Sequence, residues 1–367
     1  MLTRDDVASK VFVTDCEGPI SKNDNAYELT CHFVPNGAKL FSVISRYDDV
    51  LADVLKREGY KAGDTLKLVL PFLKAYGATN RRMTAFSEKN VLLVTGAKDT
   101  MQFVQRIMPS FIVSTSYEHY LSALCKITGF PFENTYHTRV DIDKYTITET
   151  ETKTLKQIAK KIAEMPIIEI PKNARTLKDF SLLDQSSIKW LDEVFWRIIP
   201  KMSVGKIFTE VNPVGGKEKA NAVREIVAKV GCEVNCAMYV GDSITDVECF
   251  QFVRKGDGLT VSFNGNEYAV REAEIAVMSE NTVITSILAD IFVRLGKEAV
   301  LELAENWSFM ALKKHKVNPA LLSRVHELYQ DTLPRVEIIT ANNKEKLAKE
   351  SVAFRKTVRG EAIGRLG

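Results

Sequence analysis

Two aspartates stand at the ends of similar apolar segments that lie far apart in the chain. Asp15 directly follows the apolar run 11–14, and Asp242 follows the run 237–241. In open α/β sheets, ligands bind beyond the carboxyl ends of parallel strands, so two neighbouring strands would bring these aspartates and Asp246 to one point. Uncompensated carboxylates that close together cost so much free energy that a hard cation is expected between them. The sequence therefore predicts a magnesium site at this point.

Strand-like and helix-like segments alternate around these aspartates. Short runs rich in Val, Ile and Phe are followed by stretches with apolar residues every three or four positions, and glycines stand between them. This alternation predicts an α/β fold with a doubly wound, Rossmann-like parallel sheet. Beyond the two aspartate strands, we expect strands at 91–94, 110–114 and 259–263 and helices at 118–128, 219–230, 247–253 and 282–295.

Two stretches interrupt the alternation with helical spacing alone, and a third follows it. The first interruption comes directly after the loop that holds Asp15, and the second is charged and mostly helical. The last part of the extension, 342–367, is basic and polar and is expected to be a solvated helix or frayed tail. The predicted division is a core of 1–25 plus 88–145 plus 205–296, a helical cap insertion at 26–87, a second insertion at 146–204 and a helical C-terminal extension at 297–367.

Length and composition limit the possible classes of protein. The chain has 367 residues, which exceeds the usual size of one hydrophobic core, so inserted or appended units are expected. Its 45% hydrophobic and 26% charged residues are typical of a globular protein, and a net charge of +3 does not indicate a nucleic-acid partner. No apolar run reaches the roughly eighteen residues needed to cross a bilayer, and the first residues do not form a secretion signal. We therefore predict a cytoplasmic protein without nucleic-acid or membrane partners; a homo-oligomer or protein complex stays open.

Cysteine and histidine spacing argues against zinc. The six cysteines include no Cys-x-x-Cys pair, and Cys232 and Cys236 are better explained as two buried thiols than as ligands. The five histidines show no ligand spacing.

Six polar residues follow strand ends or begin helices along the chain, in the order Asp15, Glu17, Ser114, Lys219, Asp242 and Asp246. This order resembles the haloacid-dehalogenase-like superfamily of phosphoryl-transfer enzymes. The resemblance covers 9–20, 90–145 and 210–290, and the 242 − 219 = 23 residues from lysine to aspartate are similar to the spacing in phosphoserine-phosphatase-like members. It implies a magnesium-dependent phosphatase that hydrolyses a small phosphorylated metabolite, with an insertion after the first motif as a cap.

The resemblance also implies a role for each acidic residue. Asp15 attacks phosphorus and forms an aspartyl-phosphate, which water then hydrolyses. Glu17 protonates the leaving oxygen and later activates water; the superfamily usually has an aspartate here, so this longer side chain is a departure. Magnesium would be held by Asp15, Asp242 and the backbone carbonyl of Glu17, with Asp246 as a further ligand or as a partner that orients the others.

The remaining candidates bind phosphate or substrate. Lys219 would balance the negative charge of nucleophile and phosphate, although Lys217 is a competitor that spacing disfavours. The Ser114 hydroxyl and nearby backbone N–H groups would bind phosphoryl oxygens, and Thr115 would contact substrate; capping the next helix is the alternative role for Ser114. In the cap, the residues expected to contact an anion are Arg46, Tyr47, Arg81 and Arg82, for each of which a solvated helix face is the alternative.

Three short segments look more narrowly like a group of archaeal proteins within this superfamily. They are Asp15-Cys16-Glu17-Gly18-Pro19, Arg46-Tyr47-Asp48-Asp49 and Ser114-Thr115-Ser116-Tyr117. Some members of that group carry the label of subunit R of an energy-converting hydrogenase A. The alternative prediction is therefore an accessory subunit with little or no catalytic activity that retains the fold.

Overall fold

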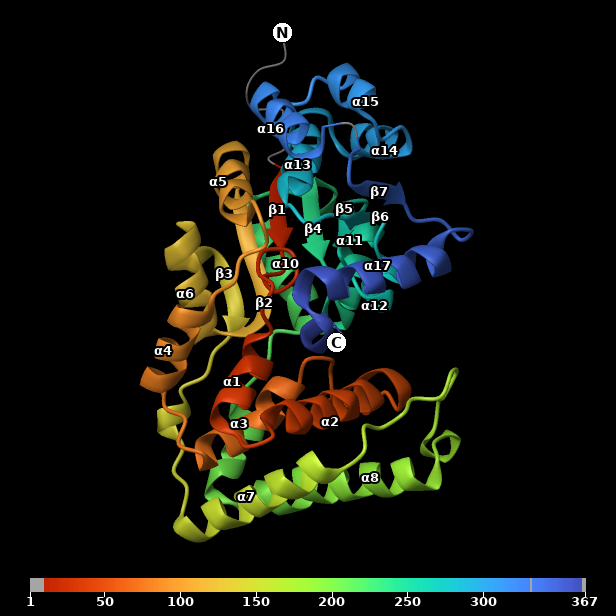
Figure 1. Cartoon of the computed structure of the whole chain (residues 1–367). Coiled ribbons are helices and arrows are strands. Elements are labelled where there is room, and N and C mark those ends of the chain that lie inside the picture. The colour runs from red at the N-terminus through yellow and green to blue at the C-terminus, as the bar shows by residue number, and fades with distance from the viewer. Residues whose placement is uncertain (1–9, 331, 365–367) are drawn as a thin grey trace.

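A seven-stranded sheet forms the centre of the chain in the computed structural model, which describes residues 10–330 and 332–364 (Figure 1). The strand order is β3-β2-β1-β4-β5-β6-β7; β1 to β6 are parallel, and β7 runs antiparallel to β6. The chain therefore leaves β1 toward β2 on one side and returns to β4 on the other. The strands are β1 (Val11–Thr14), β2 (Ser110–Tyr117), β3 (Thr135–Thr138), β4 (Ala237–Gly241), β5 (Leu259–Phe263), β6 (Ile275–Met278) and β7 (Arg335–Ile338).

Helices cover both faces of this sheet. Alternation along β1 places Phe12 in one hydrophobic cluster and Val11 and Val13 in another. The fold class expected from the sequence, a doubly wound and mostly parallel α/β sheet, is confirmed. The helices of this part are α5 (Ala97–Ile107), α6 (Glu118–Thr128), α10 (Lys217–Val230), α11 (Val247–Lys255), α12 (Glu267–Glu272) and α13 (Val283–Leu295).

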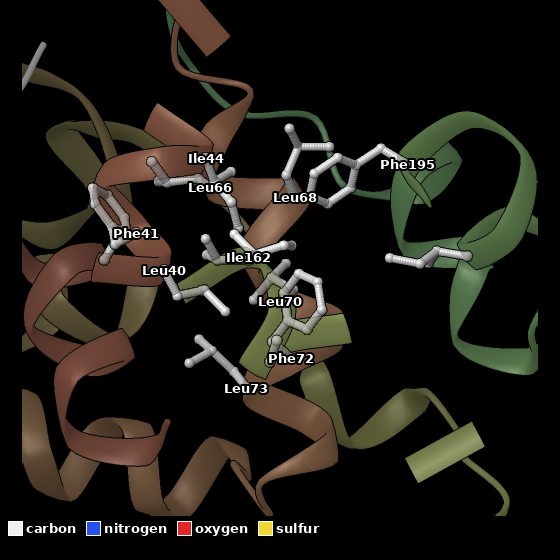
Figure 2. Close-up of a cluster of buried hydrophobic side chains, with 14 of the residues drawn as sticks. Leu40, Phe41, Ile44, Leu66, Leu68, Leu70, Phe72, Leu73, Ile162 and Phe195 are labelled. Carbon is white, nitrogen blue, oxygen red and sulfur yellow. The ribbon is translucent and has the colours of Figure 1, made fainter. Parts of the chain in front are cut away.

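The two stretches of helical spacing pack against each other. Their buried side chains form one hydrophobic cluster, to which Leu40 and Phe72 contribute from the first stretch and Ile162 and Phe195 from the second (Figure 2). Figure 1 shows these helices below the carboxyl ends of the strands. They are α1 (Asn25–Phe33), α2 (Gly37–Asp49), α3 (Thr65–Ala75), α4 (Asn80–Asn90), α7 (Glu149–Glu164), α8 (Leu182–Glu193) and the short α9 (Ile207–Glu210), with π-helical turns η1 (Val50–Val54) after α2 and η5 (Val194–Ile198) after α8.

The C-terminal extension contributes to the sheet as well as helices. Its strand β7 closes the sheet beside β6, and a long helix after it packs through Leu347 and Ala348 against Val270 and Met278. The expectation of a solvated helix or frayed tail at 342–367 is thus wrong for the helix at 344–359. The helices here are α14 (Lys297–Glu305), α15 (Phe309–Lys314), α16 (Pro319–Tyr329), α17 (Lys344–Arg359) and α18 (Glu361–Gly364). No described helix combines the length and apolarity that crossing a membrane requires.

The strand expected at 91–94 does not join the sheet, so this prediction is wrong. Leu93 makes a single bridge with Ser21, and the backbone N–H of Val94 donates to the carbonyl of Ile20 at 2.9 Å. The segment therefore pairs with the chain that leaves the Asp15 loop. The apolar composition of 91–94 predicts a strand but does not indicate which segment the strand pairs with.

Candidate active site

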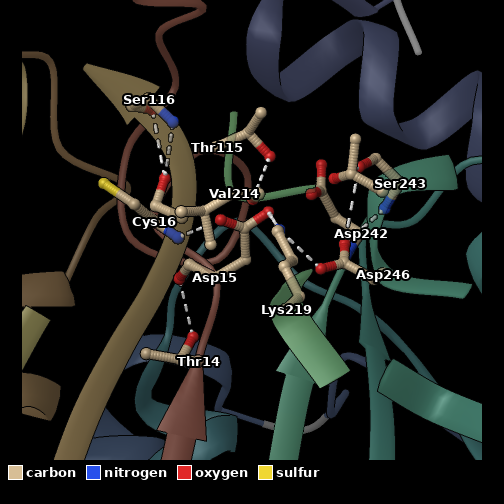
Figure 3. A network of polar contacts seen from close by, with 12 residues as sticks. Thr14, Asp15, Cys16, Thr115, Ser116, Val214, Lys219, Asp242, Ser243 and Asp246 are labelled. Carbon is tan, nitrogen blue, oxygen red and sulfur yellow. Dashed lines mark hydrogen bonds and ion pairs between the residues drawn. The ribbon is translucent and has the colours of Figure 1, made fainter. Parts of the chain in front are cut away.

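Asp15 and Lys219 form a buried ion pair at the carboxyl end of β1. The backbone N–H of Asp15 continues the pairing with β4 by donating to Val240 at 2.8 Å, which fixes the position of the side chain. Lys219, in the first turn of α10 and fully buried, donates from Nζ to Oδ2 of Asp15 at 2.6 Å (Figure 3). Burial raises the pKa of Asp15, and the nearby ammonium of Lys219 counteracts part of that rise.

Asp246 is the second partner of Lys219 and is fully engaged in hydrogen bonds. Its Oδ1 accepts from Lys219 Nζ at 2.7 Å and from the Tyr239 hydroxyl at 2.6 Å, and its Oδ2 accepts from the backbone N–H groups of Asp242 and Ser243. Burial acts to raise the pKa of Asp246, but Lys219 and these hydrogen bonds more than offset it, so the pKa lies below its usual value. This geometry favours Asp246 as a residue that orients Lys219 and the loop after β4.

Asp242 lies against the loop that carries the nucleophile candidate. Gly18 in that loop has φ +106°, and a Cβ there would lie 2.2 Å from the Cγ of Asp242. The absence of a side chain at Gly18 is therefore what allows the Asp242 carboxylate to approach Asp15. Oxygen ligand atoms of Asp15, Asp242 and Asp246 lie within 4.8 Å of one another.

Two arginines of α17 contact Asp242, and the sequence analysis missed both. Arg355 donates from Nη1 to the carbonyl oxygen of Asp242 at 3.1 Å and to Oδ2 of its carboxylate, and Arg359 donates from Nη1 to the same Oδ2 at 3.1 Å. The spacing of residues along α17 does indicate that these arginines lie on its buried face. Ser351, Arg355 and Arg359 follow Leu347 at intervals of four, so they extend the buried face of the helix.

These arginines correct the electrostatic premise of the magnesium prediction. Three carboxylates at the site contact three cations of the chain itself, namely Lys219, Arg355 and Arg359. The acidic cluster is thus not uncompensated. The case for a metal rests instead on the donor atoms, because closely spaced carboxylate oxygens and backbone carbonyls are the ligands that Mg²⁺ prefers. Within the described parts of the chain, this is the one group of three acidic, histidine or cysteine side chains close enough to share an ion.

Glu17 points toward the start of the first inserted helix. Its Oε1 accepts a hydrogen bond from the backbone N–H of Asn25, the first residue of α1, at 2.7 Å. Burial raises the pKa of Glu17 well above its usual value, and the neighbouring Asp24 adds to the rise. The raised pKa favours the protonated form of this carboxyl group.

Ser114 and Thr115 lie near the end of β2, beside the Asp15 loop. The Ser114 hydroxyl is buried and lies 3.1 Å from the hydroxyl of Ser116, while Thr115 donates to the carbonyl of Val214 at 3.0 Å. The alternative role of Ser114 as a helix cap is wrong, because Tyr117 occupies the cap position of α6 and makes no side-chain cap. Both Ser114 and Thr115 line the cleft that holds Asp15.

The cleft is bounded by the sheet, the first insertion and α17, and Arg46 and Tyr47 are not among its lining residues. Arg46 pairs with Asp49 at 3.1 Å. Tyr47 is fully buried among the inserted helices, where its hydroxyl donates to Asp192. The contact with substrate predicted for these two residues has no direct counterpart in this geometry and stays a prediction. The first insertion instead presents Phe41, Ser45, Asp48, Asp49, Gly63, Thr65 and Leu66 to the cleft.

Comparison with known proteins shows an extensive similarity to a solved structure. No family model and no curated protein matches the chain. The structure of gene product AF1437 from Archaeoglobus fulgidus is similar over 98% of this chain and 99% of that one, with 30% sequence identity and a TM-score of 0.79. A phosphoserine phosphatase in a phospho-aspartyl intermediate analogue is 13% identical over 77% of this chain and 98% of its own, with a TM-score of 0.44. A substrate-bound phosphoserine phosphatase is 13% identical over 76% of this chain and 97% of its own, with a TM-score of 0.39. Because the phosphatase likenesses are so weak, the function has to be argued from the geometry of the site.

Proposed function

We propose that this chain, which belongs to the family of the Archaeoglobus fulgidus AF1437 gene product, is a magnesium-dependent phosphatase of the haloacid-dehalogenase type that acts on a small phosphomonoester. One observation carries the proposal. Lys219 bridges Asp15 and Asp246, with Asp242 beside them, at the ends of the adjacent parallel strands β1 and β4. This arrangement supports the roles of nucleophile, cation and hard-oxygen ligands, because the residues lie beyond the carboxyl ends of the strands, where α/β proteins bind ligands.

In the proposed reaction, a carboxylate oxygen of Asp15 attacks phosphorus and the ester oxygen leaves. The protonated carboxyl of Glu17 gives its proton to that oxygen, in keeping with its raised pKa. Water then attacks the aspartyl-phosphate, Glu17 takes up the proton of the water, and phosphate leaves while the Asp15 carboxylate is restored. Lys219 balances the charge that Asp15 and the phosphoryl group bring together.

The residues present fit a magnesium ion. Asp15, Asp242 and the backbone carbonyl of Glu17 would hold it, and Gly18 provides the space in which their oxygens approach one another. When bound, the ion would neutralise the phosphate that otherwise repels a carboxylate nucleophile. Ser114 and Thr115, from the neighbouring strand β2, would hold phosphoryl oxygens on the opposite side of Asp15.

Hydrolysis of para-nitrophenyl phosphate and a panel of small phosphomonoesters in the presence of Mg²⁺ tests the proposal. We expect Asp15→Asn to lower kcat on the order of a thousandfold or more, because an amide is a poor nucleophile. Lys219→Met should lower kcat about a hundredfold by removing a cation from the transition state. Lys217→Met is the matched control, since Lys217 precedes Lys219 by two residues on α10 but is exposed, and it should retain wild-type activity.

A second measurement does not depend on turnover. Fluoroberyllate, a phosphoryl mimic, should bind the wild-type protein only with Mg²⁺ and should not bind Asp15→Asn, as followed by fluorine NMR. A wild-type protein that hydrolyses no member of the panel and binds no fluoroberyllate would contradict the phosphatase. That result would favour an accessory subunit that retains the fold.

A further inference from the structure

Helix α17 supplies the positive charges of the cleft. Of the described residues that line the cleft, only Arg355 and Arg359 are cationic. Their side chains are 3% and 4% exposed, so both guanidinium groups are almost fully withdrawn from water. Figure 1 shows the end of α17 between the sheet and the inserted helices. Since burying a guanidinium group is costly unless its donors find acceptors, the hydrogen bonds of each arginine indicate what it does.

Arg359 has acceptors for its donors within the protein. Its Nε donates to the carbonyl of Lys22 at 3.1 Å, its Nη2 to the carbonyl of Asn23, and its Nη1 to Asp242. These contacts tie the end of α17 to the chain just after the Asp15 loop. Arg359 therefore acts as a positioning residue.

Arg355 has hydrogen-bond donors without a described acceptor. Both of its hydrogen bonds come from Nη1 and end on Asp242, whereas Nε is buried without an acceptor among the described residues, and no hydrogen bond is described from Nη2. Nε and Nη2 form one edge of the guanidinium plane, and that edge matches the two oxygens of a carboxylate or phosphate. Because Arg355 lines the cleft and this pair of donors has no described acceptor, the residue is suited to bind an anion of the ligand.

The rest of the described lining offers no cation to an anion. Asp24, Asp48 and Asp49 line the cleft on the side of the first insertion, and Glu17 also lines it. Among the described lining residues, a negatively charged group attached to the scissile phosphate therefore finds a cationic partner at α17. Neutral or cationic parts of a substrate would be accommodated on the acidic side.

We propose that Arg355 binds a second anionic group, a carboxylate or a second phosphate, on the phosphomonoester that the cleft accepts. The inference rests on the proposed function, because it takes the scissile phosphate to lie at Asp15. Arg355 is then a specificity-determining residue that comes from outside both the sheet and the helical insertions. The substrate class narrows to phosphomonoesters with two anionic groups.

Binding to the catalytically inactive Asp15→Asn protein tests this inference without turnover. Calorimetry with Mg²⁺ present compares ethyl phosphate, which has only the phosphate, with phosphoglycolate and 3-phosphoglycerate, which add a carboxylate at different spacings. We expect at least one carboxylate ligand to bind about tenfold more tightly than ethyl phosphate or better. Added Arg355→Gln should remove this preference, and Arg355→Lys should retain only part of it because lysine lacks the planar fork.

Lys349→Gln is the matched control, because it removes one positive charge from an exposed position of the same helix and should leave the preference intact. The inference is overturned if Asp15→Asn shows no preference, if Arg355→Gln keeps it, or if Arg355→Gln weakens all ligands equally, which would indicate a purely structural role through Asp242. If Arg355→Gln does not fold, Arg355→Lys provides the test: a partial loss of the preference for carboxylate ligands supports the inference, and an unchanged preference overturns it. If Asp15 is required for hydrolysis of para-nitrophenyl phosphate but carboxylate ligands bind no more tightly than ethyl phosphate, only this inference is contradicted. If carboxylate ligands bind more tightly but no phosphomonoester is hydrolysed, only the proposed phosphatase function is contradicted.

Discussion

At the scale of single residues, Gly18 controls how closely Asp242 approaches the Asp15 loop. Its positive φ is unfavourable for other residues, and the Asp242 carboxylate occupies the space that a Cβ would need. We expect Gly18→Ala to displace Asp242 and to lower the affinity for Mg²⁺ at least about tenfold, a loss of about 1.4 kcal/mol, as measured by calorimetry.

Gly59→Ala separates this steric effect from backbone strain. Gly59 also has a positive φ, +73°, but no atom lies within 4 Å of a Cβ built there. Both variants should lose on the order of 1 kcal/mol of unfolding free energy through strain, and only Gly18→Ala should lose metal affinity. Equal metal affinities in the two variants would show that Asp242 does not need this close approach.

The acidic residues and the lysine of the candidate site were predicted from the sequence, and its arginines were not, although their spacing marks one face of the helix. Asp15 and Asp242 follow apolar strands, and Lys219 precedes Asp242 at a fixed spacing, so a local pattern and a parallel sheet suffice to bring them together. The contact between Arg355 and Asp242 depends instead on where α17 docks. No local pattern specifies that docking, because a polar, basic helix can equally remain in solvent.

At the scale of secondary-structure elements, the end of α2 carries a buried acid. Asp48 accepts hydrogen bonds from the Tyr60 hydroxyl and from the backbone N–H of Gly63 at 3.0 Å, which attaches α2 to the loop before α3. Burial raises the pKa of Asp48 to about 8, and the neighbouring Asp49 and Asp64 contribute to the rise.

The raised pKa makes the stability of this region depend on pH. In the unfolded chain an aspartate titrates near pH 4, so between about pH 4 and 8 the folded protein binds more protons than the unfolded protein. The contribution of Asp48 to the free energy of unfolding therefore falls as pH rises, by up to about 1.4 kcal/mol per pH unit. Asp48→Asn removes this titration. Urea unfolding at pH 5 and pH 8 should show the variant gaining stability relative to wild type at the higher pH.

Glu58→Gln provides the comparison, because Glu58 is an exposed carboxyl of the same insertion. If both variants change relative stability with pH in the same way, burial at Asp48 is not the cause. A relative stability of Asp48→Asn that falls as pH rises would reverse the sign argued here.

Elements specified by a clear local pattern were predicted well, whereas the pairing of some strand-like segments was not. The helix expected at 118–128 is α6, because an apolar stripe and a terminal glycine specify a helix locally. The segment 91–94 has the composition of a strand, yet it pairs with residues 20–23. Strand β7 joins the sheet from far along the chain, and the sequence analysis expected only helices there.

At the scale of the whole molecule, the two helical insertions share one hydrophobic core. Phe195, which follows α8, is fully buried and lies across from two aromatic rings of the first insertion, with centroid distances of 5.8 Å to Tyr47 and 6.2 Å to Phe72. We therefore expect the insertions to unfold together as one cap over the cleft.

Phe195→Ala tests this cooperativity. Removing a buried phenylalanine side chain costs about 3–5 kcal/mol, and the loss should act on both insertions. Hydrogen exchange followed by mass spectrometry should show faster exchange in α2 and α3 as well as in α7 and α8, with β1 and β4 unchanged. Leu182→Ala, at a position that is 82% exposed, should leave all of these rates as in wild type. Faster exchange confined to α7 and α8 would indicate two independent insertions.

The shared core also shows what the sequence leaves open at this scale. Helical periodicity predicted two insertions, and the boundaries proposed for them stay a prediction. Periodicity shows that a helix has an apolar face but does not identify the surface that the face covers. The apolar helix faces of the insertions at 26–87 and 146–204 largely cover one another.

The cleft joins groups that are 355 − 15 = 340 residues apart in the chain. The proposed nucleophile is residue 15, and the guanidinium groups that contact Asp242 beside it are residues 355 and 359. Because synthesis proceeds from the N-terminus, Asp15 leaves the ribosome well before these arginines exist. A nascent chain, or one cut before α17, would carry Asp242 without its two arginine partners. Proteolysis before α17 would therefore leave the Asp15–Lys219 pair in place but remove both guanidinium groups from the cleft.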